Sequence, residues 1–305
     1  MAKQKLFLMI AAIFIAATLA HAQPADSLPE KYVKKVLIEA KWGDGPGEFQ
    51  LGPFSEVRGF VSSITIDKEG IIYIADCYAR KINIFNNNGN FLSDIQLSNT
   101  EFTVRGAMTV DSKAQTLYLM VRDAKKARPA IVEINLKTKK IVNSYVIPTG
   151  VGAIDFYNDM DGGIYVWSRP ALRPQTGDII KGFVPLEKYT ADVNNKNADA
   201  ILSKSAIVDI SKFKNGLWRN GISVNGLKAF IDGDEKNRVI YQDDKGQRKC
   251  TACLLSSFWG EGEKETYITS SNNVAFDYHM NCYQIIGSDE GLKVIKYTPD
   301  EEIWK

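Results

Sequence analysis

Histidine and cysteine, the side chains that most often carry catalysis or hold a metal, are scarce in this chain. The 305 residues include two histidines and four cysteines. His21 lies in an N-terminal segment that we expect to be removed, which leaves His279. One histidine excludes any mechanism that needs two or more of them, including multi-histidine metal sites. Because His279 lies in a predicted surface turn between two strands, we expect no catalytic residue there, and we identify none elsewhere.

Cys250 and Cys253 have the spacing of half a zinc or redox site. A zinc site needs a second pair of cysteines or histidines at short spacing, and the sequence has none. A disulfide is the alternative in an exported protein. Residues three apart in an extended strand are about 10 Å apart, whereas bridged Cα atoms lie about 4.4–6.8 Å apart. A Cys250–Cys253 bridge therefore requires a bend between them. Cys77 with Cys282 is another candidate pair, and the pairing stays open.

The acidic stretch 232–237 superficially resembles a calcium-binding loop. Lys236 occupies the third ligand position, and Asp243 stands where such loops have a glutamate at the twelfth position. A charged hairpin turn is therefore the better interpretation. We expect neither a metal nor a cofactor.

The elements that position these side chains are short β-strands. Runs of β-branched and aromatic residues, separated by turns rich in Gly, Asn and Asp, fill the chain from Val57 to its end. The clearest unit has predicted strands at 62–67, 71–76, 81–85 and 91–97. Four antiparallel strands in about 36 residues make one sheet of the size of a propeller blade.

The same pattern recurs in four further units. The last unit lacks a full fourth strand, while the segment 32–41 is a predicted strand with no unit of its own. Pairing the two would hide two sheet edges, which are an aggregation hazard. We therefore predict an all-β fold, a β-propeller of four-stranded antiparallel blades whose ring is closed by the N-terminal strand. Five blades are counted, and six are possible if one lies within 168–220. Two or three separate sandwiches are the alternative. The further units have predicted strands at 108–111, 116–119, 131–134 and 141–145; at 153–156, 162–167 and 183–189, ending near 202; at 221–225, 227–232, 238–243 and 249–256; and at 273–277, 281–286 and 292–297.

The stretch 42–97 resembles the opening of an NHL-type β-propeller. A Gly-rich lead-in at 42–49 precedes a unit that follows the family's repeat, and the resemblance is recognisable again at 274–303. It implies an exported bacterial propeller used as a scaffold. The family's relatives include protein-binding modules, RNA-binding modules and lyases with a metal in the central channel, so the fold does not fix the function. The repeat positions are filled by Asp67, Gly70, Tyr73, Ala75, Asp76, Lys81, Ile82, Phe85 and Gly89.

The N-terminal segment has the pattern of an export signal. Lys3 and Lys5 precede an apolar run of 15 residues, 6–20, which is shorter than the ~20 residues that span a bilayer. Small residues at the −3 and −1 positions predict cleavage after Ala22. We therefore expect a periplasmic or secreted protein with one propeller domain over 23–305 and no membrane span. Without the two lysines the 38 basic residues become 36, equal to the 36 acidic ones, so nucleic acid is not expected as a partner.

The loops between the second and third strands of all blades lie on one face of a propeller. In the first three units these loops and their flanks are basic, and in the last two they are acidic or mixed. Because rigid scaffolds often present ligand sites on loops, we expect a basic sector that binds an unknown anionic glycan or protein of the cell envelope. The predicted binding residues are Arg80, Lys81, Arg122, Lys125, Lys126, Arg128, Arg169 and Arg173.

The sequence thus favours a monomeric binding or interaction module over an enzyme. The alternative is a propeller-type lyase or lactone hydrolase with a cation in the central channel. Carboxylates and amides that converge on the axis would favour the enzyme, and an axis lined by apolar and small residues would count against it.

Overall fold

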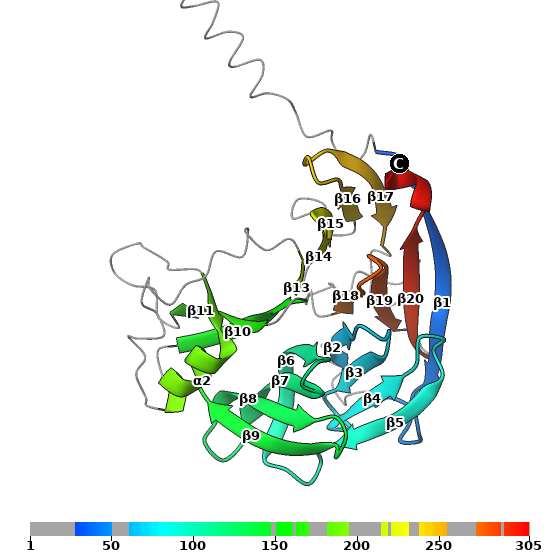
Figure 1. Ribbon diagram of the computed structural model, residues 1–305. Coiled ribbons are helices and arrows are strands. Elements are labelled where there is room, and N and C mark those ends of the chain that lie inside the picture. The colour runs from blue at the N-terminus through cyan, green and yellow to red at the C-terminus, as the bar shows by residue number, and fades with distance from the viewer. Residues whose placement is uncertain are drawn as a thin grey trace, which may run out of the picture.

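The protein is a β-propeller, in which antiparallel sheets fan out around a common centre. The strands nearest to this centre include Val61–Ile66, Phe102–Asp111, Val151–Asp159 and Val274–Phe276 (Figure 1). The predicted signal segment 1–22 lies outside the described residues. In this computed structural model the described residues are 28–50, 61–147, 151–160, 163–170, 182–194, 215–218, 221–231, 238–254, 273–287 and 290–304.

The first two units form regular four-stranded sheets, with the orders β2-β3-β4-β5 and β6-β7-β8-β9. Both predicted units are confirmed, although the strands of the second are longer than predicted. A buried apolar cluster joins the facing sides of the two sheets and includes Ile82, Ile95, Leu117 and Val132. The strands are β2 (Val61–Ile66), β3 (Ile72–Asp76), β4 (Lys81–Phe85), β5 (Phe91–Gln96), β6 (Phe102–Asp111), β7 (Thr116–Asp123), β8 (Arg128–Asn135) and β9 (Lys140–Val146).

The third and fourth units are joined into one eight-stranded sheet with the order β12-β11-β10-β13-β14-β15-β16-β17. The junction is a short antiparallel pairing of β10 with β13, in which Tyr157 lies opposite Trp218 and Asn158 opposite Leu217. The strands are β10 (Val151–Asp159), β11 (Gly163–Pro170), β12 (Gly182–Pro185), β13 (Gly216–Trp218), β14 (Gly221–Val224), β15 (Leu227–Ile231), β16 (Arg238–Gln242) and β17 (Arg248–Cys253).

One predicted strand is wrong. The run 183–189 was expected to be extended, but the strand β12 ends at Pro185 and the helix α2 (Leu186–Asn194) follows at once. Leu186 and Tyr189 are three residues apart and both buried, which is helical spacing, and Glu187 lies in the first turn, where an acidic side chain suits the helix dipole.

The N-terminal strand β1 (Tyr32–Lys41) completes the last sheet, whose order is β1-β20-β19-β18. It pairs antiparallel with β20 from Tyr32 opposite Pro299 to Lys41 opposite Gly291, so the predicted pairing of the two chain ends is confirmed (Figure 1). Closure of the complete ring stays a prediction. The remaining elements are β18 (Val274–Phe276), β19 (Cys282–Gly287), β20 (Gly291–Pro299) and the short 3₁₀ helix η5 (Glu301–Trp304).

The Gly-rich lead-in 42–49 ties this last sheet to the first one. The backbone N–H of Phe49 donates to the carbonyl of Lys41 at the end of β1, over 3.2 Å. On the other side, the ammonium of Lys81 in β4 donates to the carbonyl of Gly45 over 3.2 Å. The ring of Phe49 is fully buried and stacks on Phe85, with centroids 6.3 Å apart. The motif that carries the family resemblance therefore has a structural role here.

Cys77, Cys250 and Cys282 are thiols in this structure, which therefore holds neither of the candidate bridges Cys250–Cys253 and Cys77–Cys282. The first fails because β17 pairs in regular register with β16 from Cys250 to Cys253, without the bend that a bridge needs. The second fails because the Cys77 thiol is turned toward the second sheet, where it donates to the carbonyl of Val104 over 3.3 Å. Cys282 is instead buried in the core between the fourth and last units.

Candidate functional site

Two of the eight predicted binding residues are occupied by contacts within the protein. Lys81 is 4% exposed, and its ammonium holds the Gly45 carbonyl. Beside it, burial raises the pKa of Asp76 above its ordinary value, although backbone N–H donors and Lys81 act in the opposite direction. The Asp76 carboxylate accepts hydrogen bonds from the backbone N–H groups of Gln50 and Tyr78. This buried ionic group fixes the β3–β4 turn to the lead-in segment.

Arg80 has a similar internal role. It has a left-handed backbone (φ 51°) in the β3–β4 turn, and its guanidinium donates to the carbonyls of Thr100 and Phe102, the latter over 2.9 Å. The Thr100 carbonyl belongs to the connection between the first and second sheets, and Phe102 is the first residue of β6. Arg80 therefore acts as a positioning residue for the crossover between the first and second sheets.

The structure brings four of the predicted cations together on the β7–β8 hairpin, which we call the basic hairpin: Arg122, Lys125, Lys126 and Arg128. All four side chains are exposed. Lys125 lies 3.8 Å from the carboxylate of Glu101, and Lys126 lies 3.9 Å from that of Asp123.

The basic hairpin is held to the crossover segment that Arg80 clamps. The backbone N–H of Ala124 donates to the carbonyl of Glu101 over 2.9 Å. The buried Asp123 carboxylate also accepts the backbone N–H of Lys126 over 3.0 Å, which shapes the turn. The cations are thus presented on a hydrogen-bonded scaffold, and Glu101 lies beside them as an intramolecular competitor for Lys125.

The remaining two predicted cations are Arg169 and Arg173. Arg169 lies near the end of β11, where its backbone pairs with Gly152. Arg173 lies outside the described residues, as does the acidic stretch 232–237.

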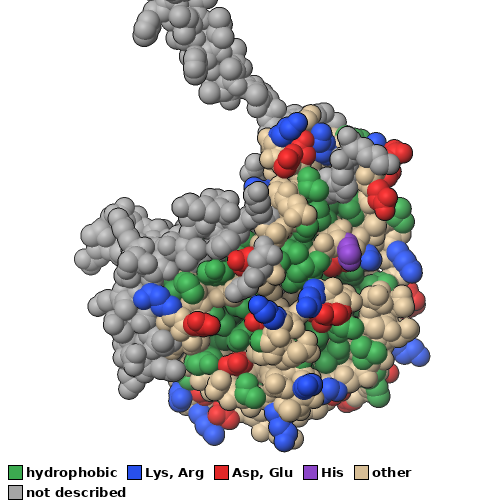
Figure 2. All heavy atoms as spheres, viewed as in Figure 1, with side chains coloured by type: hydrophobic (Ala, Val, Ile, Leu, Met, Phe, Trp, Pro, Cys, Tyr) green, Lys and Arg blue, Asp and Glu red, His purple; other side chains and the backbone are tan. Residues whose placement is uncertain are grey.

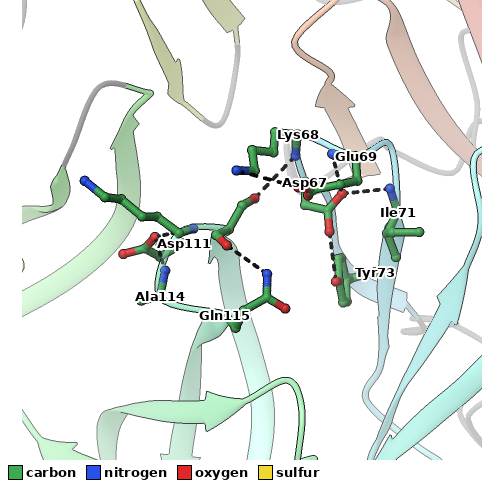
Figure 3. A network of polar contacts seen from close by, with 10 residues as sticks. Asp67, Lys68, Glu69, Ile71, Tyr73, Asp111, Ala114 and Gln115 are labelled. Carbon is green, nitrogen blue, oxygen red and sulfur yellow. Dashed lines mark hydrogen bonds and ion pairs between the residues drawn. The ribbon is translucent and has the colours of Figure 1, made fainter.

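The turns between first and second strands form a polar network at the opposite end of the sheets (Figure 3). The buried carboxylate of Asp67 accepts the N–H groups of Glu69 and Ile71 and the hydroxyl of Tyr73, the last over 3.0 Å. Burial raises the pKa of Asp67, and burial with the nearby Asp67 charge raises the pKa of Tyr73 well above its ordinary value.

The last sheet repeats this arrangement at the same spacing. Asp277 accepts the N–H of His279 and, over 2.7 Å, the hydroxyl of Tyr283. The repeat aspartates therefore stabilise turns rather than offer themselves to a ligand. His279 is exposed in its turn, as predicted.

Burial and the charges of three carboxylates on this face raise the pKa of one tyrosine hydroxyl, that of Tyr278. Burial, followed by the charges of Asp67, Asp111 and Glu69, raises the pKa of Tyr278 to about 12. Within the described stretches, no group of three or more His, Cys, Asp or Glu side chains is arranged to hold a metal ion. The same stretches contain no helix that is both long and apolar enough to cross a membrane.

No family model matches the sequence, and neither does any curated protein. Solved structures with similar chain traces include virginiamycin B lyase from Staphylococcus aureus, at 13% identity over 83% of this chain and all of that one, with a TM-score of 0.37. A luciferin-regenerating enzyme is 8% identical over 88% of this chain and 96% of its own, with a TM-score of 0.42. The aldose sugar dehydrogenase from Streptomyces coelicolor is 9% identical over 89% of this chain and all of its own, with a TM-score of 0.44. Likeness at this level says nothing about the activity of this chain.

Proposed function

We propose that this protein is a binding module that captures an anionic glycan or acidic protein surface of the cell envelope through its basic hairpin. The observation that carries the proposal is the gathering of Arg122, Lys125, Lys126 and Arg128, all exposed, on one hydrogen-bonded hairpin. Within the described residues, the two arginines take part in no ion pair. They are therefore available to an external anion.

The strength of such a site is limited by its exposure to solvent. An exposed ion pair contributes about 0.2–1 kcal/mol, so four cations support weak binding that a ligand with several negative charges would strengthen. The carboxylates of Glu101 and Asp123 compete for Lys125 and Lys126 and lower the affinity for an external anion further. Electrostatic contacts of this kind weaken as salt rises, because the screening length falls from about 10 Å at 0.1 M to about 3 Å at 1 M.

The proposal includes the NHL-type relationship, export with cleavage after Ala22, one propeller domain over 23–305 and a monomeric state. The first of these is supported by the internal contacts of Asp67, Asp76 and Lys81, which occupy the repeat positions that the resemblance requires.

The test is a titration with polygalacturonate, a soluble polyanionic glycan, at several salt concentrations. The hairpin variant Arg122→Gln/Lys125→Gln/Lys126→Gln/Arg128→Gln should lose binding. A second variant, Lys31→Gln/Lys34→Gln/Lys35→Gln/Lys41→Gln, removes the same amount of charge from other exposed positions and should bind as the wild type does. Equal loss in both variants, or binding that is indifferent to salt, would contradict the proposal. An acidic protein is tested in the same way if the glycan does not bind.

A further inference from the structure

A second group of exposed cations lies at the other end of the sheets. These lysines, which we call the turn lysines, occupy the β2–β3, β6–β7 and β8–β9 turns and the start of β9. Their side chains are exposed. Figure 2 shows Lys and Arg side chains, interspersed with Asp and Glu, over the lower part of the molecule, where the sheet of β6–β9 lies. The turn lysines are Lys68, Lys113, Lys137, Lys139 and Lys140.

Hydrogen bonds hold the three turns next to one another. The N–H of Leu136 in the β8–β9 turn donates to the carbonyl of Gln115 in the β6–β7 turn over 2.9 Å. The N–H of Lys68 in the β2–β3 turn contacts the hydroxyl of Ser112 over 3.4 Å (Figure 3). The turn lysines therefore form one patch over the first two sheets rather than three unrelated positions.

Each turn is also fixed internally. The carboxylate of Asp111 accepts the backbone N–H groups of Lys113 and Ala114, both over 2.9 Å. The side-chain oxygen of Asn135 accepts the N–H of Thr138 over 2.9 Å. The backbones of these turns are thus fixed by hydrogen bonds, and the long lysine side chains extend from them into solvent.

Most of the turn lysines are not neutralised. Lys68 pairs with Glu69 over 3.6 Å. Within the described part of the chain, Lys113, Lys137, Lys139 and Lys140 take part in no ion pair. This differs from the basic hairpin, where both lysines lie beside a carboxylate. Counted by ion pairs, the turn lysines are therefore the less compensated of the two cationic groups, and the carboxylates of the same turns, Asp67 and Asp111, are occupied by backbone N–H donors.

The chemistry of the patch indicates its partner. All five cations are lysines, which act as point charges and lack the planar fork with which arginine reads a single carboxylate or phosphate. The large apolar side chains that are most exposed in the described structure lie on outer strands rather than in these turns, with Val142 on β9 the nearest along the chain. The turns therefore offer charge without an apolar core of the kind that protein interfaces usually bury.

We propose that the turn lysines dock this face of the propeller on a surface of anionic lipid headgroups. Turns at one end of neighbouring sheets can meet a planar surface together, and lysines near such a surface attract it without insertion. Each lysine is expected to contribute about fivefold in affinity, so removing four should weaken binding on the order of 100-fold or more. The proposal does not depend on the function proposed for the basic hairpin, which lies at the other end of the sheets.

The experiment is co-sedimentation of the mature chain, residues 23–305, with phosphatidylcholine vesicles that contain about one third phosphatidylglycerol, and with pure phosphatidylcholine vesicles as the neutral surface. We expect binding to the anionic vesicles only, reversed by salt. The variant Lys113→Gln/Lys137→Gln/Lys139→Gln/Lys140→Gln should lose it. The hairpin variant, which removes the same charge at the opposite end, should retain it. If the fourfold variant does not fold, Lys137→Gln/Lys140→Gln is compared with Lys125→Gln/Lys126→Gln, which removes the same two charges from the basic hairpin.

Several results would overturn the proposal. The wild type could fail to sediment with anionic vesicles at low salt, or the two fourfold variants could lose binding equally. Binding of polygalacturonate through the turn lysines, without vesicle binding, would assign the patch to a soluble polyanion instead. Loss of glycan binding in the hairpin variant would leave the lipid proposal untouched, so the two proposals fail separately.

Discussion

Gly89 is the position at which one added carbon atom tests the contact between the first and last sheets. It lies in the β4–β5 turn with φ 84°, and a Cβ built there would lie 1.9 Å from the carbonyl oxygen of Leu37 in β1. Gly89→Ala must therefore move one of the two main chains. Left-handed backbone costs alanine about 1–2 kcal/mol, and overpacking adds about 1–3 kcal/mol. We expect a total loss of about 3 kcal/mol in the free energy of unfolding.

Gly70→Ala is the matched control. Gly70 has φ 79° in the β2–β3 turn, but its nearest neighbour, the Cβ of Asn87, would lie 3.1 Å away. The exposed Asn87 side chain has to move by only a few tenths of an ångström, so the loss should stay close to the backbone cost of about 1–2 kcal/mol. Urea unfolding of both variants gives the comparison, and at about 2–4 °C per kcal/mol Gly89→Ala should also melt several degrees lower. Equal losses in the two variants would refute the close approach of Gly89 to β1.

Three further predictions concern buried groups. Lys81→Met leaves Asp76 buried without its nearby cation and should cost about 3 kcal/mol of unfolding free energy, measured by chemical denaturation; a loss below about 1 kcal/mol, typical of an exposed ion pair, would contradict this. Burial raises the pKa of Asp67 above 3.8, so the stability that it contributes is present below that pH and is lost as pH rises through the folded-state pKa. Asp67→Asn should flatten the pH dependence of unfolding in that interval, and an unchanged profile would count against it. Finally, Cys250 and Cys282 should react with a thiol reagent only after unfolding, and a reductant should not change the melting temperature; a drop in melting temperature would reveal a disulfide.

The strands were predictable because their signals are local. Alternating β-branched runs and turn residues located β4 at its observed bounds, and the same signal located β1 at 32–41. The pairing of β1 with β20 was predictable because each chain end carries strands with an unpaired sheet edge, which can be counted in the sequence without knowing which distant residues touch. The helix α2 was missed because a short apolar run after Phe183 fits a buried strand and a helix equally well.

The candidate site was only partly predictable, because burial of a charge depends on partners far along the chain. Arg80 and Lys81 look like exposed loop cations in the sequence, yet their acceptors are carbonyls about 20 and 36 positions away. The turn lysines were overlooked for a different reason. The run 137–140 is visible in the sequence, but its meaning depends on which turns lie side by side, and that required the Leu136–Gln115 hydrogen bond.

The salt dependence of polygalacturonate binding, measured side by side for the wild type and the hairpin variant, tests the central claim most directly. The account predicts that wild-type binding weakens steadily as salt rises and that the hairpin variant shows little binding at any salt concentration. Undiminished binding by the hairpin variant would contradict the account and place the ligand elsewhere on the protein.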